Sequence, residues 1–206
     1  MRRNTVIPIN GNNERMGKLF KTPKHMLLYR GLPAIIATTT IMKGFGGKVK
    51  CLVGEKYFDI PFVDNQRVKP TSNTVETLRQ TSMHVNTFVV DCDVIPLKLT
   101  PPKGNTVYLF KNTTGINQYS NFKLDSEGYV IDCNEKGEEF EWCGAGVYYF
   151  CDQNDFSSSF KSKSLSEVIK HQTEHAKTFN LPYMRFKGDT KSKIFRFGTL
   201  TDILCS

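Results

Sequence analysis

The feature that most constrains the fold of this chain is the shortness of its apolar runs, which glycine and proline repeatedly interrupt. Runs of four to nine residues that are rich in β-branched and aromatic side chains and bounded by turn residues are typical of β-strands. In the first third of the chain, four such runs occur at residues 26–29, 34–42, 48–53 and 57–62, with a glycine turn at 44–47. A further strand is predicted at residues 85–94, around Val85, Phe88, Val90 and Val94.

One segment has a clear helical pattern. Apolar residues recur on one face between Leu165 and Phe179, Ser164 or Ser166 can cap the first turn, and Pro182 follows the end. A shorter helix is predicted at 74–81. We therefore expect an α+β fold with a mostly antiparallel β-sheet, one clear helix at about 165–179 and an extended basic N-terminal arm.

The arm is predicted from the distribution of charge. The net charge is +8, and the first 50 residues hold ten Lys and Arg side chains against one acid, Glu14. Residues 1–24 have few apolar anchors, and such a basic segment is attracted to phosphates or acidic surfaces. A solvated tail that aids solubility is the alternative interpretation. The residues predicted to bind a polyanion or a partner are Arg2, Arg3, Arg15, Lys18, Lys21 and Lys24.

A length of 206 residues suits one domain or two small ones. Prolines at 96, 101 and 102 interrupt the pattern, so the segment 100–105 is the best candidate for a boundary. This divides the chain into the arm at 1–24, a β-rich N-terminal half at 25–100 and an α+β C-terminal half at 106–206. One continuous domain is the alternative.

The six cysteines and the N-terminus bear on the compartment. The chain begins Met-Arg-Arg without an apolar stretch that would indicate a secretory signal, and a chain of this size needs no disulfides to fold. We expect reduced and mostly buried thiols and an intracellular or virion location. The longest uncharged apolar stretch, Gly31–Met42, is shorter than the roughly 20 residues needed to span a membrane.

Motifs that could carry chemistry are few. His171 to His175 has the H-x-x-E-H pattern of inverted zinc metalloproteases, in which two imidazoles one helical turn apart share a zinc ion. A third ligand is not evident, and the alternative interpretation is an exposed flank of the helix. Cys133, Cys143 and Cys151 are spaced unlike a zinc knuckle. We therefore assign no catalytic residue, no metal site and no cofactor.

A more distinctive stretch follows residue 107. A Tyr-containing strand at Val107–Lys111, a polar loop near Tyr119–Phe122, an acidic stretch at Glu138–Glu141 and the strand Cys143–Phe150 follow one another. In this order they resemble a small uncharacterised domain of large DNA viruses and phages, over residues 108–160. The resemblance implies a component of a virus or phage particle.

The string Gly144 to Phe150 is also similar to a strand of ADP-ribosyltransferase-like enzymes. In that family the tyrosine that stacks on nicotinamide would fall on Tyr148. The expected histidine is missing from the earlier strand at 108–112, while Glu139 and Glu141 are similar to the paired glutamates of a second class of these transferases. The resemblance implies a transferase as an alternative function.

Our leading prediction is a non-catalytic structural or interaction protein, a virion or phage-particle component. Its arm would bind neighbouring protein subunits or packaged nucleic acid, by charge rather than by sequence. Nothing in the sequence compels an enzymatic interpretation. The alternatives are an ADP-ribosyltransferase-like enzyme and a zinc-dependent hydrolase centred on His171 and His175.

Overall fold

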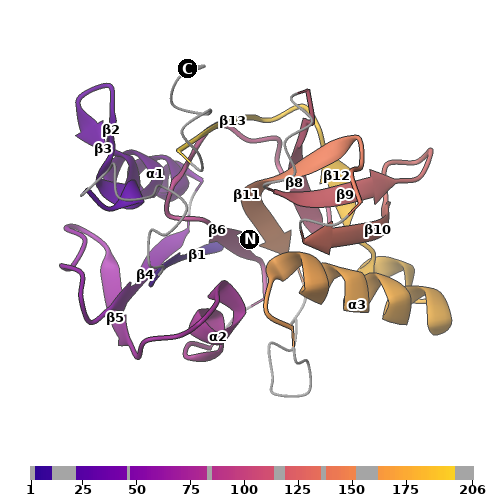
Figure 1. Cartoon of the computed structure of the whole chain (residues 1–206), viewed down its shortest axis with the longest axis horizontal. Coiled ribbons are helices and arrows are strands. Elements are labelled where there is room, and N and C mark those ends of the chain that lie inside the picture. The colour runs from indigo at the N-terminus through magenta and orange to yellow at the C-terminus, as the bar shows by residue number, and fades with distance from the viewer. Residues whose placement is uncertain are drawn as a thin grey trace.

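The computed structural model describes residues 3–10, 22–45, 47–82, 85–113, 119–135, 138–151 and 162–197. In these residues a nine-stranded mixed sheet runs through the molecule and helices cover it (Figure 1). Its strands are β1 (Asn4–Ile9), β4 (Lys48–Gly54), β5 (Asp64–Val68), β6 (Thr87–Val90), β8 (Thr106–Lys111), β9 (Ser120–Leu124), β10 (Val130–Glu135), β11 (Trp142–Phe150) and β12 (Lys187–Asp189).

The remaining elements lie outside this sheet. Two small sheets are formed by β2 with β3 and by β7 with β13. Their bounds are β2 (Leu28–Tyr29), β3 (Leu32–Pro33), β7 (Val94–Lys98) and β13 (Lys193–Arg196). The helices are α1 (Ala34–Gly44), α2 (Thr74–Arg79) and α3 (Leu165–Thr178), with single 3-10 turns η2 (Lys24–Met26) and η3 (Pro182–Met184).

One part of the sheet is parallel. Four strands lie in the order β5-β4-β1-β6, and each neighbouring pair among them is parallel. The chain leaves β1, forms α1 and returns in β4 on one side of β1. After β5 and α2 it returns in β6 on the other side of β1. The strand order therefore reverses direction at β1, and the carboxyl ends of all four strands lie at one edge of the sheet.

The rest of the sheet is built around β11. Its second half pairs antiparallel with β6 and its first residues with β9, while β8 pairs antiparallel with both halves of β11. β10 extends the sheet beyond β9, and β12 joins parallel to β8. Because β6 precedes residues 100–105 and β11 follows them, one continuous sheet contains strands from both sides of that segment.

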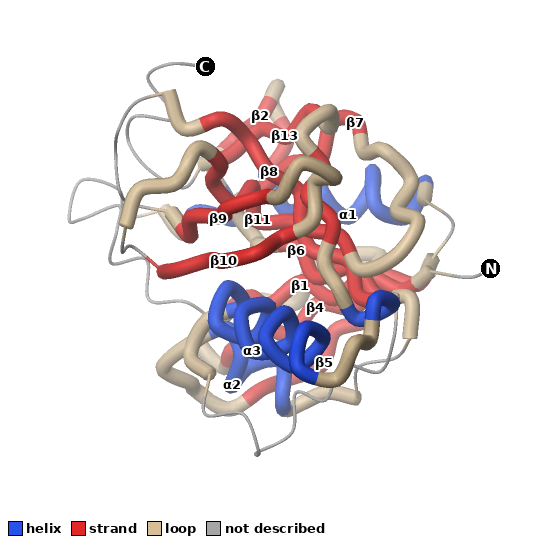
Figure 2. The backbone as a smooth tube through the Cα atoms, turned by 90° about the vertical axis from the view of Figure 1, so that its right-hand side faces the viewer, coloured by secondary structure: helices blue, strands red, loops and turns tan. Residues whose placement is uncertain are grey.

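Helices cover both faces of the sheet, as Figures 1 and 2 show, with α1 on one face and α2 and α3 on the other. The core follows these two layers. Ile35 and Met42 of α1 pack with Ile7 of β1, whereas Val6 of the same strand packs with Leu78 of α2. A sheet buried on both faces produces apolar runs without a clear alternation.

The prediction of a mostly antiparallel sheet with one clear helix is wrong, and residues 34–42 are the main cause. Their β-branched side chains suggested a strand, but they form α1. Ala34, Ile35, Thr38, Thr39 and Met42 are buried at helical spacing. The Thr38 hydroxyl donates to the carbonyl of Ala34 within the helix and reaches the carbonyl of Val94 at 2.5 Å. Tertiary contacts on this face outweigh the modest helix propensity of threonine.

Other strands also differ from the prediction. Residues 4–9, assigned to the arm, form β1 in the middle of the parallel strands, where Val6, Ile7 and Ile9 are buried. The run 57–62 is a loop, and the polar segment Asp64–Val68 is an edge strand. The strand predicted at 85–94 is divided into β6 and β7 by a turn at 91–93.

The helices predicted at 74–81 and 165–179 are present as α2 and α3. Ser164 caps α3 as expected, since its side chain accepts from the backbone of Glu167. Among the described residues, no helix is long and apolar enough to cross a membrane. The five described cysteines are free thiols, and three of them are buried.

Candidate functional site

A pocket of about 670 Å³ opens at the carboxyl edge of the parallel strands. Residues that follow β1 and β6 line it, including Asn10, Asp91 and Asp93. These are the two strands between which the strand order reverses. In open α/β sheets, the crevice outside the carboxyl ends of the strands at such a switch point is the usual place of ligand binding.

The floor of the pocket holds an ion pair. The Lys24 ammonium lies 3.4 Å from a carboxylate oxygen of Asp93, and the two side chains are only 12% and 16% exposed. Lys24 comes from the single turn η2, whereas Asp93 comes from the turn after β6. The sheet thus brings together two groups that are 69 residues apart, and their low exposure strengthens the interaction relative to a surface pair.

The second aspartate, Asp91, is held by the glycine-rich part of β11. Its backbone N–H donates to the carbonyl of Gly146 at 2.8 Å. Gly146 has a φ of 76°, and a Cβ there would lie 2.7 Å from an Asp91 carboxylate oxygen. Only glycine combines this backbone conformation with such a close approach. The distinctive glycine string at 144–146 therefore supports the pocket floor.

Two groups beside the ion pair stay uncharged. Burial, reinforced by Asp93 and Asp91, raises the pKa of the Cys92 thiol well above its ordinary value. Burial also lowers the pKa of His25 to about 4, against a smaller opposing effect of Asp93. The thiol therefore does not act as a thiolate nucleophile at neutral pH, and His25 contributes no positive charge.

The wall on the side of the parallel strands is built from neutral hydrogen-bonding groups. The Asn10 amide donates to Lys69 O at 3.0 Å and to the Thr71 hydroxyl at 2.9 Å. The Thr71 and Thr77 hydroxyls are 2.6 Å apart. A Cβ at Gly54 would lie 2.3 Å from Asn10 Oδ1. The glycine at the end of β4 therefore leaves the space that the Asn10 amide occupies.

The opposite wall comes from the antiparallel part of the sheet and carries a carboxylate. Glu135, at the end of β10, accepts hydrogen bonds from Ser120 Oγ at 2.5 Å and from Ser166 Oγ at 2.8 Å. Tyr148 and Gly144 of β11 line the same wall. Burial raises the pKa of the Tyr148 phenol well above its ordinary value, so it is a neutral hydrogen-bonding group.

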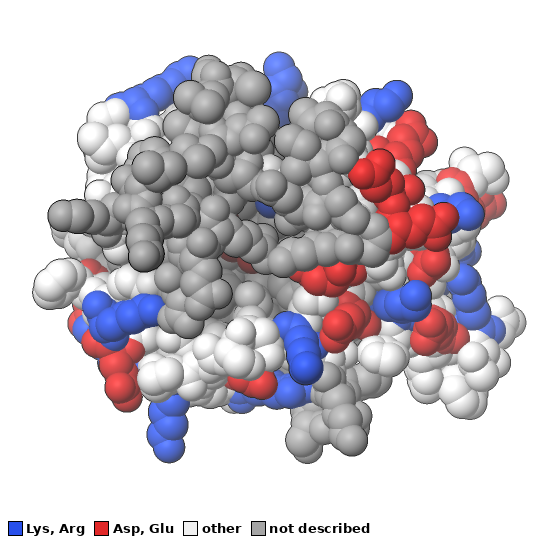
Figure 3. Space-filling view, in the orientation of Figure 1, with Lys and Arg blue, Asp and Glu red and all other residues white. Residues whose placement is uncertain are grey.

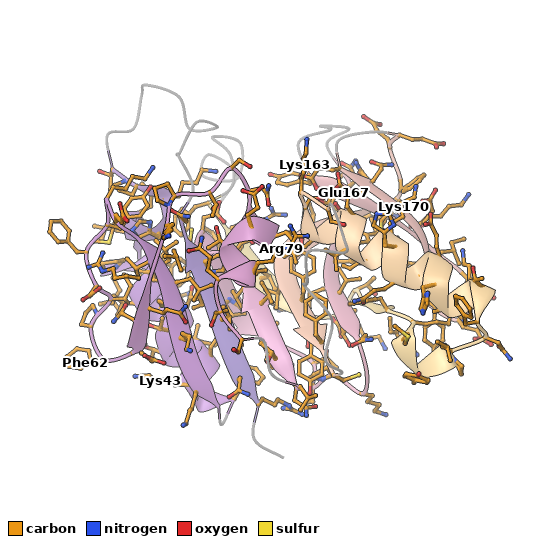
Figure 4. The ribbon with its side chains drawn as sticks, turned by 90° about the horizontal axis from the view of Figure 1, so that it is seen from below. Lys43, Phe62, Arg79, Lys163, Glu167 and Lys170 are labelled. Atoms are coloured by element: carbon orange, nitrogen blue, oxygen red, sulfur yellow. The ribbon has the colours of Figure 1, made fainter. Side chains whose placement is uncertain are left out.

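The start of α3 completes the rim. Figure 4 shows Lys163 and Glu167 at the end of α3 that lies toward Arg79 of α2. The Glu167 carboxylate accepts from the backbone N–H of Lys163 at 2.6 Å, while the Ser164 hydroxyl accepts from Glu167 N. Reciprocal bonds of this kind satisfy the first turn of the helix from within the protein.

The pocket belongs to a fold found in solved structures. The inositol-1-phosphate CTP transferase of T. maritima aligns with a TM-score of 0.73 at 12% identity, over 98% of this chain and 91% of that chain. The UDP-glucose pyrophosphorylase of Acinetobacter baumannii aligns with a TM-score of 0.74 at 14% identity, over 100% and 92%. The chain has the nucleotidyltransferase fold.

A third example is the CTP:phosphocholine cytidylyltransferase of Streptococcus pneumoniae, with a TM-score of 0.65 at 16% identity over 100% of this chain and 97% of that chain. At these identities the likeness establishes the fold alone. No protein-family model matches the chain, and no curated protein sequence matches it.

The prediction of a non-catalytic virion or phage-particle component is wrong, and so is the leaning against an enzyme. The nucleotidyltransferase fold extends over nearly the whole chain, and it is shared with transferases and pyrophosphorylases. The physical reason for the error is that the pocket residues come from separate segments, which the sheet brings together. None of these segments forms a recognisable local motif.

The two family resemblances are corrected by the same fold. The segment compared with a viral domain and with ADP-ribosyltransferase strands contains β8 to β11 of the nucleotidyltransferase sheet. Its glycine string is explained by the contact of Gly146 with Asp91. Glu139 and Glu141 lie before β11, outside the set of residues that lines the pocket.

The zinc-hydrolase alternative is also wrong. His171 is half exposed and lies 3.9 Å from Glu174 on the same helix, while the ring of His175 contacts Phe179. In the described part of the chain, no three His, Cys, Asp or Glu side chains are grouped to hold a metal ion.

Of the six basic residues predicted to bind a polyanion or partner, Arg2, Arg15, Lys18 and Lys21 lie outside the described residues. Arg3 precedes β1 and hydrogen-bonds to Tyr149, at the opposite edge of the sheet from the pocket. Lys24 lies in the pocket itself. On the face in Figure 3, the coloured Lys and Arg side chains are interspersed with acidic ones. The binding role of the arm stays a prediction.

Sequence reasoning missed most of the pocket. Asp91 and Asp93 were included in a continuous strand. Neither Glu135 nor Arg196, which also lines the pocket, was selected. The available signal was the pair of aspartates directly after the apolar run Phe88–Val90. Charged residues that follow a buried strand mark the edge where ligands bind in α/β sheets.

Proposed function

We propose that this protein is a nucleotidyltransferase that transfers a nucleoside monophosphate from a nucleoside triphosphate to a phosphate monoester. The observation that carries this proposal is the position of Lys24, Asp91 and Asp93 at the switch point of the fold. The three similar structures are named as an inositol-1-phosphate CTP transferase, a CTP:phosphocholine cytidylyltransferase and a UDP-glucose pyrophosphorylase, which supports a nucleotide donor and a phosphorylated acceptor.

In the proposed reaction, an oxygen of the acceptor phosphate attacks the α-phosphorus of the donor. The bond from that phosphorus to the bridging oxygen breaks, and pyrophosphate leaves with the electron pair. Such a transfer depends mainly on positioning and on stabilising negative charge. The Lys24 ammonium supplies a fixed positive charge for the donor phosphates. The polyanion that Lys24 is predicted to bind would then be the triphosphate of the donor.

The two carboxylates suit a divalent cation. Mg²⁺ is usually bound in nucleotide sites by one or two carboxylates together with substrate phosphates and water, so Asp91 and Asp93 fit this donor set without a third protein ligand. When bound, the ion would neutralise part of the phosphate charge. The neutral wall at Asn10, Thr71 and Thr77 would bind the nucleoside, and the wall at Glu135 the acceptor.

The test is pyrophosphate release by the full chain with Mg²⁺, using CTP, UTP, dTTP, ATP or GTP. Glucose 1-phosphate, inositol 1-phosphate and phosphocholine serve as acceptors. We expect turnover with at least one pair, and a loss of kcat/KM of about 10²- to 10³-fold in Lys24→Met and Asp93→Asn. Lys111→Met is the matched control, because Lys111 forms an exposed ion pair with Glu141 at 3.7 Å.

Two outcomes would contradict the proposal. One is the absence of turnover with every pair while the folded protein binds no nucleoside triphosphate. The other is turnover that Lys24→Met and Lys111→Met reduce equally, which would place the chemistry elsewhere in the protein.

A further inference from the structure

Arg196, at the end of β13, lines the same pocket in a tightly fixed position. Its guanidinium carbon lies 4.2 Å from the ring centre of Tyr119 and 5.1 Å from that of Phe110. Its Nη1 donates to the carbonyl of Gly144 at 2.5 Å. Two aromatic faces and one carbonyl therefore hold the charged group on the wall that also carries Glu135.

This positive charge has no carboxylate partner among the described residues. The ion pairs found there leave Arg196 out. Its Nε is buried without a hydrogen-bond partner, but so is that of Arg185, so the missing carboxylate is what distinguishes Arg196. A guanidinium has five N–H donors, and removing a cation from water without an anion is unfavourable. The contacts of Arg196 with the protein alone leave this charge uncompensated.

Arg185 provides the contrast within the same molecule. Its guanidinium carbon also lies 4.2 Å from a tyrosine ring, that of Tyr129. Its Nη2, however, lies 2.6 Å from a carboxylate oxygen of Asp125. Arg185 is thus a structural arginine with an anion supplied by the protein. Arg196 has the same aromatic support, lines the pocket and lacks the anion.

The backbone places Arg196 between the two walls of the pocket. Arg196 pairs with Val94 across β13 and β7, and the next residue, Phe197, donates to the carbonyl of Asp93. The backbone of Arg196 is therefore beside the floor, whereas the guanidinium extends to the wall of Tyr119 and Gly144. This location is where the acceptor phosphate would meet the α-phosphate of a donor held at Lys24.

We propose that Arg196 binds the phosphate group of the acceptor and positions it for attack on the donor. This rests on the proposed function. The planar fork of arginine matches phosphate geometry and can form two parallel hydrogen bonds. The carboxylate of Glu135 on the same wall is unsuited to a phosphate, so it would face the part of the acceptor that lies away from its phosphate.

The kinetic test compares Arg196→Met with Arg185→Met, using the donor and acceptor pair that is turned over. We expect Arg196→Met to raise the KM for the acceptor by about 10- to 100-fold, because a charge-assisted hydrogen-bond pair is lost. The KM for the nucleoside triphosphate stays within about twofold. Arg196→Lys, which keeps the charge and loses the fork, gives an intermediate KM for the acceptor. Arg185→Met leaves both KM values unchanged.

A second measurement does not depend on turnover. The probe is inorganic phosphate, followed by titration calorimetry with the wild-type protein, Arg196→Met, Arg196→Lys and Arg185→Met. We expect Arg196→Met to lose most phosphate binding and Arg185→Met to retain it. Thermal unfolding of each variant checks the fold, and Arg196→Met should melt at or above the wild-type temperature because an uncompensated charge is removed.

The outcomes separate the two proposals. Phosphate binding that depends on Arg196, in a protein that transfers no nucleotide, would support the anion site and reject the proposed reaction. Transfer with an unchanged acceptor KM in a folded Arg196→Met variant would reject the role of Arg196 alone. A rise in the KM for the nucleoside triphosphate instead of the acceptor would also reject it, since Arg196 would then bind the donor.

Discussion

At the scale of single residues, the pocket floor combines a buried histidine with the Lys24–Asp93 ion pair. His25 is 5% exposed, and its ring packs edge-to-face against Tyr57 with 4.9 Å between ring centres. Burial lowers the pKa of His25 from its ordinary value of 6.5 to about 4. This histidine next to Lys24 therefore stays neutral at physiological pH, and the positive charge of the floor comes from the lysine.

The lowered pKa of His25 predicts a dependence of stability on pH. Between about pH 6.5 and 4 the unfolded chain binds a proton at this position and the native protein does not, so the free energy of unfolding falls as the pH falls. The difference corresponds to about 3 kcal/mol over that window. Urea unfolding at several pH values should show a smaller pH dependence for His25→Asn than for the wild type.

His171→Asn is the control for this experiment, since His171 is half exposed on α3. It should keep the pH dependence of the wild type. An equal pH dependence in His25→Asn and His171→Asn would show that the buried histidine is not the group responsible.

At the scale of secondary-structure elements, the two capped helices α2 and α3 form opposite sides of the pocket rim. Asn73 Oδ1 accepts from Glu76 N at 2.9 Å at the start of α2, and Ser164 Oγ accepts from Glu167 N at 3.2 Å at the start of α3. Each cap satisfies a backbone donor that the helix itself leaves unpaired. Because the capped helix ends lie at the rim, the caps stabilise both the helices and the position of the residues that line the pocket there.

Replacing either cap by alanine should reduce the free energy of unfolding by about 1 kcal/mol, measured by urea unfolding. The kinetic effects should differ. Asn73→Ala should raise the KM for the nucleoside triphosphate, because Asn73 lies on the neutral wall with Thr71 and Thr77. Ser164→Ala should raise the KM for the acceptor, because the Ser164 hydroxyl is bonded to Ser166, which holds Glu135.

The two variants control for each other, since both remove one cap of the same kind. Equal effects of both variants on the same KM would contradict the assignment of the two walls. Asn73→Ser keeps a capping side chain and should restore most of the stability.

The elements also show how far the sequence predicts the fold. α3 could be predicted because its cap, its amphipathic pattern and Pro182 agree, and a shorter helix was predicted at 74–81, where α2 lies. α1 could not, since Thr38, Thr39 and Ile41 favour strands locally and only contacts with β7 and the core make them helical. The edge strand β5 was missed because its polar residues lack the period of a half-buried strand.

The site was less predictable than the fold for a similar reason. Lys24 was selected from its charge, but its partner Asp93 follows it by 69 residues and was assigned to the interior of a strand. Arg196 and Glu135 line the same pocket only because the fold brings β13 and β10, which belong to different sheets, to it. Proximity of this kind depends on the order of the strands in the sheet. The periodicity of apolar residues along the sequence predicts individual elements but not this order.

At the scale of the whole molecule, the pocket lies where the two halves of the sequence join. β11 connects them, since its residues 147–150 pair with β6 of the first half, while β8 and β9 of the second half also pair with β11. The Lys24–Asp93 ion pair on the floor comes from residues before 100, whereas Gly146, which bonds to Asp91, comes after it. The pocket residues Glu135 and Arg196 also come after residue 100. A division at 100–105 would therefore cut through both the sheet and the pocket.

We predict that the described fold unfolds in a single cooperative transition. The chain has one tryptophan, Trp142, which packs against the core in β11 and reports on the antiparallel part of the sheet. Far-UV circular dichroism reports on the backbone of both halves. Midpoints in urea measured by Trp142 fluorescence and by circular dichroism should coincide. A fragment of residues 1–103 should lack a cooperative transition, because β6 loses its partner β11 and its edge of the sheet is left unpaired.

Two separated midpoints, or a fragment that unfolds cooperatively, would show instead that the halves are independent domains. A nucleoside triphosphate with Mg²⁺ distinguishes the cases further. If the pocket is built by both halves of one cooperative unit, ligand binding stabilises the native state as a whole and raises both midpoints by the same amount. If the halves were independent, the ligand would raise mainly the midpoint of the half that binds it. A common shift would therefore tie the integrity of the pocket to the continuity of the sheet through β6 and β11.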